Sequence, residues 1–241
     1  MGTLLHAVCR VIRLDYETIT DCALSATLAA LLFPLLFPLI VFLVGTVGAL
    51  ALSTVLTVGY WALSTAGLFV STSSVQCGRL SALLPVTRSR QVVGRYLSAG
   101  ILGLICLVEM WIQMGLLWLI DVFCMPLPWQ NTPTPMSTIP LSAVVGGALA
   151  VFVLIVSLEM PFYYALEFTK ASSWFWSSVF VIAAAIAIGI NIIPDNVQDT
   201  IGTSLLALPG YALALAITAC CIIAVTVSYM VSHHIWLRKE F

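Results

Sequence analysis

Long apolar stretches make up most of the chain, and short polar segments separate them. A helix needs about 20 mainly apolar residues to cross the hydrocarbon of a bilayer. Residues 23–70 are nearly unbroken apolar sequence of about twice that length, so we expect two spans there, joined by a tight turn near Gly45 to Gly48. The pattern as a whole predicts six membrane-spanning helices, at roughly residues 23–43, 47–70, 96–122, 141–161, 174–191 and 210–230.

Composition agrees with this all-α membrane fold. Of the 241 residues, 61% are hydrophobic and 8% are charged, whereas soluble domains carry about 25% charged residues. The length suits a single transmembrane domain over residues 1–241 and leaves no room for a soluble catalytic domain. The net charge of −1 provides no basic face of the kind that binds nucleic acid.

Basic residues predict the orientation of the chain in the membrane. With six spans, every Lys and Arg falls on one side, and the opposite segments 121–140 and 191–209 contain none. Cytoplasmic loops carry the excess of positive charge, so we expect both termini in the cytoplasm. The basic residues are Arg10, Arg13, Arg79, Arg88, Arg90, Arg95, Lys170, Arg238 and Lys239.

Two further segments are predicted to be helical without crossing the membrane. Residues 4–19 have one apolar and one charged face, which is typical of a helix lying on the membrane surface; the alternative is a plain extension of the first span. Asp195 and Gln198 resemble a capping box, so a short re-entrant or surface-lying helix is expected over about 195–208.

The polar segment 71–95 is predicted to contain two helical pieces. Three leucines before Pro85 share one face of a short amphipathic helix. Pro85 disfavours helix in the residue before it. A new helix is then expected to begin at Thr87 or Ser89, either of which can cap it, and to continue directly into the third span.

Several polar residues lie within the predicted spans. Glu109 lies near the middle of the third span with Gln113 one turn further on. An ionisable group at that depth is costly and suggests function, but it is equally consistent with a neutral Glu hydrogen-bonded to the Ser/Thr/Tyr stripe of the second span. The second span carries a polar stripe, for which packing is favoured over a wet path. The stripe consists of Ser53, Thr57, Tyr60 and Ser64.

The sequence offers no catalytic motif. There is no GxxxxGK[ST] sequence for ATP phosphates, and histidine occurs only near the two ends of the chain. The seven cysteines show no metal-ligand spacing. We therefore expect no enzyme activity, no metal and no cofactor in this chain.

Three segments carry recognisable motifs: residues 84–97 with Leu84-Pro85-Val86-Thr87-Arg88, residues 161–171 and residues 228–241. Together they resemble the permeases of bacterial ABC-2 type transporters, in particular the small six-span branch that includes peptide and toxin exporters. Residues 84–97 are similar to the Leu-Pro-(Ile/Val)-(Ser/Thr)-Arg segment of that family and its Tyr-Leu continuation. Residues 161–171 are similar to the loop after the fourth span, although Glu167 and Phe168 replace the usual Gly and Tyr. Residues 228–241 resemble the family's C-terminal ending.

The resemblance implies an export permease that pairs with a separate ABC ATPase and with a second permease copy or a paralogue. ATP and Mg²⁺ would be bound by the ATPase, and the cargo would be a hydrophobic or amphipathic molecule. The coupling loop that contacts the ATPase would comprise Arg79, Leu83, Leu84, Pro85, Arg88 and Arg90. A second cytoplasmic loop would present Tyr164, Glu167 and Lys170. The candidate translocation path consists of Glu109, Gln113, Ser53, Thr57 and Tyr60.

Two other functions remain open from the residues alone. One is an ion-coupled secondary transporter that uses Glu109, although no paired broken helices or internal repeat accompany it. The other is a membrane partner that does not transport, such as an immunity or sensor protein.

Overall fold

The computed structural model describes residues 24–73, 87–124, 139–192 and 210–238, and the elements within these ranges are all helical. Four predicted features lie outside these ranges: the surface helix 4–19, the amphipathic helix before Pro85, most of the 121–140 segment and the 195–208 helix. The elements are α2 (Leu24–Leu32), η1 (Phe33–Ile40), α3 (Val41–Ser73), α5 (Arg88–Cys124), α6 (Leu141–Ala165), α7 (Phe168–Ile192) and α9 (Gly210–Arg238).

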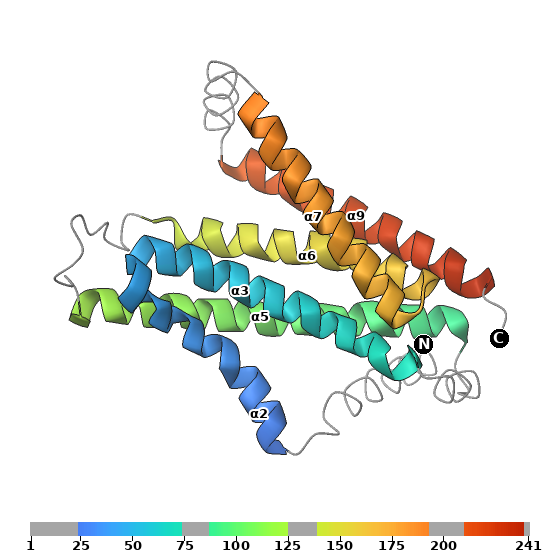
Figure 1. Cartoon of the computed structure of the whole chain (residues 1–241), viewed down its shortest axis with the longest axis horizontal. Helices are drawn as coiled ribbons and strands as arrows, with labels where there is room; N and C mark the ends of the chain where they lie inside the picture. The colour runs from blue at the N-terminus through green and yellow to red at the C-terminus, as the bar shows by residue number, and fades with distance from the viewer. Residues whose placement is uncertain (1–23, 74–86, 125–138, 193–209, 239–241) are drawn as a thin grey trace. The chain divides into compact units, whose positions relative to one another are not determined.

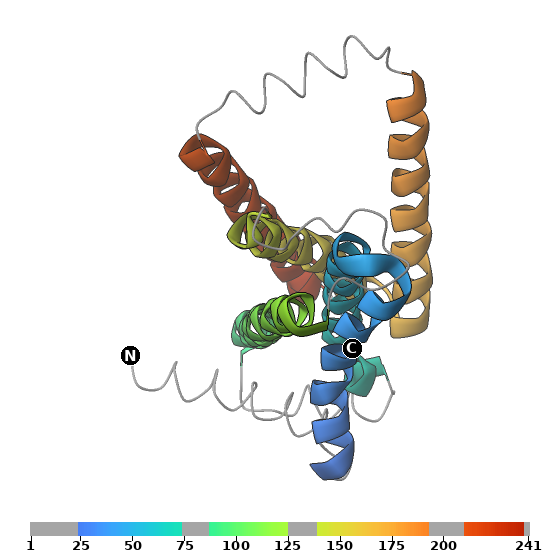
Figure 2. The ribbon, with the colours of Figure 1, turned by 90° about the vertical axis from the view of Figure 1, so that its left-hand side faces the viewer.

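The chain forms two compact units, and the boundary between them falls within α6, after Val156. In the first unit α3 packs against both η1 and α5, and α5 also contacts η1. Both views show α3 and α5 lying side by side (Figures 1 and 2). The second unit, Ser157–Lys239, contains the end of α6 together with α7 and α9.

The predicted turn between the first two spans is confirmed at Gly45. This residue has φ 77° and ψ 176° inside the stretch assigned to α3, and Figure 1 shows the chain reversing its direction between α2 and α3. Such a conformation is essentially restricted to glycine, because a Cβ would clash with the backbone. The reversal brings η1 back against α3.

The first span departs from α-helical winding at its two prolines. Both Pro34 and Pro38 are buried in η1, a 3-10 helix that interrupts the α-helical winding between α2 and the turn at Gly45. A proline has no N–H for the bond to the carbonyl four residues earlier, so the α-helical ladder loses two bonds one turn apart.

The helix predicted to start at Thr87 or Ser89 begins at Arg88. The Thr87 carbonyl accepts hydrogen bonds from the backbone N–H groups of Arg90 and Gln91, at 2.9 and 3.2 Å. From there α5 continues for 37 residues to Cys124. Arg88, Arg90 and Arg95 therefore lie on the same continuous helix as the third span, as predicted.

The connection after the fourth span is shorter than predicted. The sequence places a loop at residues 162–173, but α6 continues through Pro161 to Ala165, and α7 begins at Phe168. The last turn of α6 is retained despite the proline because its aromatic side chains pack within this unit. Tyr163 stacks on Phe168 with ring centroids 5.5 Å apart, and Tyr164 makes an edge contact with Trp236 of α9 at the same distance.

Four stretches of the described chain are long and apolar enough to cross a membrane. They are Leu28–Phe69, Arg88–Phe123, Leu141–Ala165 and Gly210–Arg238. The first contains 42 residues, and the reversal at Gly45 divides it in two. α9 exposes most of its apolar side chains, whereas Ser228 and Ser232, one turn apart, are buried. The chain is thus a multi-pass helical membrane protein.

Candidate functional site

A cluster of buried polar side chains joins α3 to α5 within the apolar region. Trp61 Nε1 donates a 2.6 Å hydrogen bond to Oε2 of Glu109. One turn away on both helices, the Thr57 hydroxyl lies 3.0 Å from Oε1 and 2.8 Å from Nε2 of Gln113. All four side chains are at most 5% exposed. Because the i and i+4 positions of one helix meet the i+4 and i positions of the other, the two helices are antiparallel here.

The same cluster extends to the proline-containing segment. Gln113 Nε2 donates to the carbonyl of Pro34 at 2.8 Å, and the Tyr60 hydroxyl donates to the carbonyl of Ala30 at 2.8 Å. In an α-helix these two carbonyls would accept from residues 34 and 38, which are both prolines. Side chains of α3 and α5 therefore take the positions of two missing backbone donors.

The polar stripe predicted on the second span divides into two kinds of residue. Ser53 and Ser64 bond to carbonyls of their own helix, those of Leu50 and Tyr60. Thr57 and Tyr60 instead bond to other elements. The stripe thus contributes to helix packing, the interpretation favoured from the sequence.

Glu109 has a hydrogen-bonded environment, but its donor is the indole of Trp61 and not a member of the predicted Ser/Thr/Tyr stripe. This contact accounts for how a carboxyl group is accommodated inside an apolar bundle, since a buried polar group without a partner is costly. Whether Glu109 and Gln113 line a translocation path stays a prediction.

Two more polar contacts connect α3 and α5 near their ends. The Thr46 hydroxyl donates to Oδ1 of Asp121 at 3.2 Å. Near the other end, the guanidinium carbon of Arg95 lies 4.4 Å from the centroid of the Phe69 ring, a distance typical of a cation–π interaction. The pair of helices is therefore connected along most of its length.

The described part of the predicted coupling loop is the first turn of α5. Arg88 and Arg90 are half-buried residues of that turn. Arg79, Leu83, Leu84 and Pro85 lie outside the described residues. Arg95, two turns further along α5, belongs to the same basic segment and packs on α3 through Phe69.

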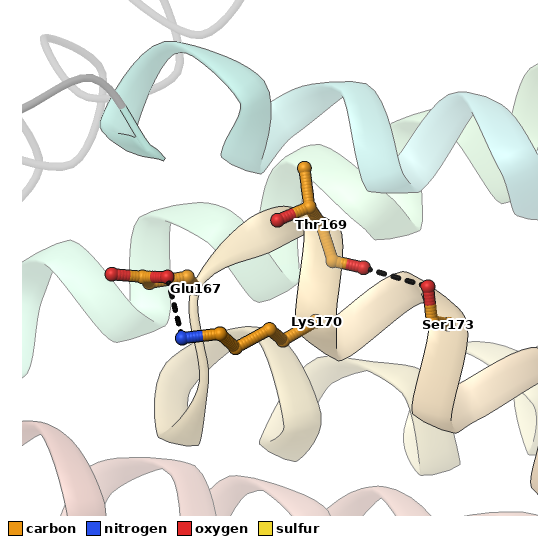
Figure 3. Close-up of polar contacts among 4 residues, drawn as sticks. All are labelled: Glu167, Thr169, Lys170 and Ser173. Atoms are coloured by element: carbon orange, nitrogen blue, oxygen red, sulfur yellow. Dashed lines mark hydrogen bonds and ion pairs between the residues drawn. The ribbon is translucent and has the colours of Figure 1, made fainter.

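The residues of the second predicted loop occupy three different elements. Tyr164 is a buried residue of α6, and Lys170 lies in the first turn of α7. Glu167 lies in the connector, where its carbonyl accepts from the backbone N–H of Ala171 at 2.8 Å. Figure 3 shows the ion pair between Lys170 Nζ and Glu167 Oε2, 3.1 Å apart, with both side chains largely exposed. The Ser173 hydroxyl also donates to the Thr169 carbonyl at 3.0 Å (Figure 3).

Sequence reasoning missed the partners of the predicted residues. Trp61 follows Thr57 by four residues, as Gln113 follows Glu109, and this matched spacing could have indicated the two pairs. The carbonyls of Ala30 and Pro34 could have been identified as acceptors four residues before each proline.

The long apolar helices define a polytopic membrane protein. Its buried polar side chains form hydrogen bonds between helices. A family model described as "ABC-2 family transporter protein" matches residues 19–236. The chain therefore belongs to the ABC-2 transporter family and is a permease, the transmembrane component of an ABC transporter. Searches of curated proteins and of solved structures found no match to the chain.

Proposed function

We propose that this permease belongs to an ABC exporter of the bacterial cytoplasmic membrane, in which a separate ATPase subunit hydrolyses ATP. Its cargo would be hydrophobic or amphipathic, such as a peptide, a lipid-like molecule or a drug. The family membership supports the general role. The resemblance of residues 84–97, 161–171 and 228–241 to the small six-span branch supports export.

The proposed topology has six spans with both termini in the cytoplasm. The reversal at Gly45 divides Leu28–Phe69 into two passes. Three further stretches suit one pass each, and the 25 residues of α7 also exceed the length needed for a crossing. With this count, every basic residue lies on the cytoplasmic side.

The observation that carries the proposal is the continuity of α5. Its 37 residues extend for about 55 Å at 1.5 Å per residue, well beyond the roughly 30 Å of bilayer hydrocarbon. Arg88 in its first turn and Glu109 in the buried cluster are separated by about 30 Å of the same helix. A push on the basic end is therefore transmitted to the interior without an intervening joint.

The contacts of α5 distribute such a push over its neighbours. Arg95 holds the end of α3 through the ring of Phe69, and Gln113 holds both Thr57 and the Pro34 carbonyl. In this proposal the ATPase docks on residues 71–95, with ATP and Mg²⁺ bound on the ATPase. A second copy of the permease or a paralogue completes the transporter.

Isolation of the permease from its native membranes, in mild detergent with an affinity tag, tests this proposal. We expect a subunit with a GxxxxGK[ST] sequence to purify with it and to hydrolyse ATP, and replacement of the lysine of that sequence to abolish hydrolysis. Transport of a cargo in liposomes should then require ATP inside the compartment that contains the ATPase.

A different outcome would favour one of the other functions. Transport that persists without ATP and collapses in the Glu109→Gln variant would identify an ion-coupled transporter. Protection or signalling without any cargo movement would identify a partner that does not transport.

A further inference from the structure

Two backbone carbonyls of the first span are bonded by side chains from two different helices. The Ala30 carbonyl accepts from the Tyr60 hydroxyl of α3, and the Pro34 carbonyl accepts from the Gln113 amide of α5. They are the two carbonyls whose α-helical donors would be residues 34 and 38. The prolines thus remove the donors that an α-helix would give these two carbonyls, and Tyr60 and Gln113 each donate to one of them.

The backbone hydrogen bonding of η1 is weaker than that of an α-helix. η1 is a 3-10 helix of eight residues between α2 and the turn at Gly45. A 3-10 helix has poorer hydrogen-bond geometry than an α-helix, and runs longer than four residues are uncommon. A long 3-10 stretch inside a helix often marks a hinge or strain. The position of η1 therefore depends strongly on its contacts with α3 and α5.

The contacts around η1 are concentrated on one side of the segment. Pro34 and Pro38 are both buried, while Leu36 and Leu39 are each more than half exposed. Phe33 is half exposed, and its ring centroid lies 5.8 Å from that of Tyr60 in α3. The η1 segment thus presents its proline side to α3 and α5. The Gln113 bond reaches the carbonyl of the buried Pro34, whereas the Tyr60 bond reaches the carbonyl of the exposed Ala30 in α2.

We propose that Tyr60 and Gln113 are positioning residues that hold the α2–η1 segment in place, and that this segment pivots at Pro34 and Pro38 when the two bonds open. The residues act through the Ala30 and Pro34 carbonyls, not through a cargo. The inference does not depend on the proposed export function, because the pivot is a property of the isolated chain.

A double-mutant cycle on the purified full-length chain in detergent separates carbonyl capture from ordinary packing. Gln113→Leu should lower Tm by several degrees, since about 1 kcal/mol corresponds to roughly 2–4 °C for a chain of this size. Pro38→Ala restores an N–H that can bond to the Pro34 carbonyl. In the Pro38→Ala background, Gln113→Leu should therefore lower Tm by no more than about half of the loss that it causes in the otherwise wild-type chain.

Thr57→Val is the matched control. It removes the Thr57 hydroxyl from Gln113 but leaves the bond from Gln113 to the Pro34 carbonyl. Its Tm loss should be the same with or without Pro38→Ala. Tyr60→Phe with Pro34→Ala gives an independent cycle for the Ala30 carbonyl. Additive Tm losses in both cycles would overturn the capture.

Pivoting itself is measured by double electron–electron resonance in a variant without cysteines. Nitroxides at the exposed positions Leu28 and Leu52 report the separation of α2 from α3. We expect a broadened distance distribution in Gln113→Leu and a narrow one when Pro38→Ala is added. An equally narrow distribution in Gln113→Leu would overturn the pivot, even if the Tm cycle supports the capture. If the Tm cycles and the distance distributions come out as expected but the permease moves no cargo, only the proposed export function is contradicted.

Discussion

The buried cluster of α3, η1 and α5 and the α6–α7 connector both contain polar residues that the sequence marks as functional, but their surroundings differ. Glu109 and Gln113 are buried and each is hydrogen-bonded across helices. Glu167 and Lys170 form an ion pair within one short segment, in the open. Polar groups in apolar surroundings depend on their partners, whereas exposed groups exchange them for water.

This difference suggests that the buried cluster and the connector have different roles in the permease. The interior cluster determines how the helices sit against one another, so changes there alter stability and coupling together. The Glu167–Lys170 pair of the connector is largely exposed, so we expect changes to it to leave stability nearly unchanged. Four substitutions test this distinction through their effect on stability, which should decrease from Gln113→Leu to Glu167→Ala.

Gln113→Leu should have the largest effect on stability. It removes donors to the Pro34 carbonyl and to Thr57. Leaving a buried polar partner unsatisfied costs about 1–3 kcal/mol. Thermal unfolding in detergent measures the change, with Ile112→Leu on the exposed neighbouring position as the control. Equal stability of the two variants would show that the cluster does not hold the helices.

Gly103→Leu extends the comparison to apolar packing. A Cβ at Gly103 would lie 2.9 Å from Cε1 of Phe152, so the ring of this α6 residue packs directly against the backbone of α5 there. Overpacking of this kind costs about 1–3 kcal/mol. Gly115→Leu, on the same helix with open space around it, is the control. Its stability should be unchanged or slightly higher, because leucine favours helix more than glycine does.

Trp61→Phe should have a moderate effect, because it removes the donor to Glu109 while largely preserving the aromatic contact. Interhelical hydrogen bonds in membranes contribute about 0.6 kcal/mol on average and up to about 1.7. A cycle with Glu109→Leu measures the coupling by thermal unfolding. Coupling near zero would mean that the indole and the carboxyl group are neighbours without a stabilising bond.

Glu167→Ala should have the smallest effect. The ion pair with Lys170 is exposed, and such pairs contribute about 0–1 kcal/mol. We expect Tm to change by less than about 2 °C, with Lys170→Ala giving a similar value. A loss of Tm as large as that of Gln113→Leu would show that the connector contributes as much to stability as the buried cluster does.

Local signals predicted much of this fold. Gly45 was predicted as a turn because the apolar stretch around it is too long for one crossing, and its φ of 77° confirms the turn. The start of α5 was predicted from capping residues after Pro85, and Thr87 precedes its first residue. Both features depend on residues close in sequence.

Features that depend on tertiary contacts were missed. Pro161 was expected to end the fourth span, but α6 continues past it because aromatic contacts hold its last turn. Trp61 was not assigned as the partner of Glu109, since periodicity places residues on a face but does not say which side chain they meet. The roles predicted for residues of the two loops, such as Arg88 and Lys170, depend on contacts with a partner subunit that lie outside this chain.

In the proposed mechanism an ATPase drives this permease through the basic first turn of α5. The most direct measurement is the ATP hydrolysis that purifies with the full-length permease from native membranes, compared between wild type and Arg88→Glu. Arg238→Glu, a charge reversal in the last turn of α9, is the control. We predict that Arg88→Glu lowers the co-purified ATPase and its activity at least tenfold while Arg238→Glu leaves both unchanged. Wild-type levels of ATPase and activity in Arg88→Glu would contradict the claim.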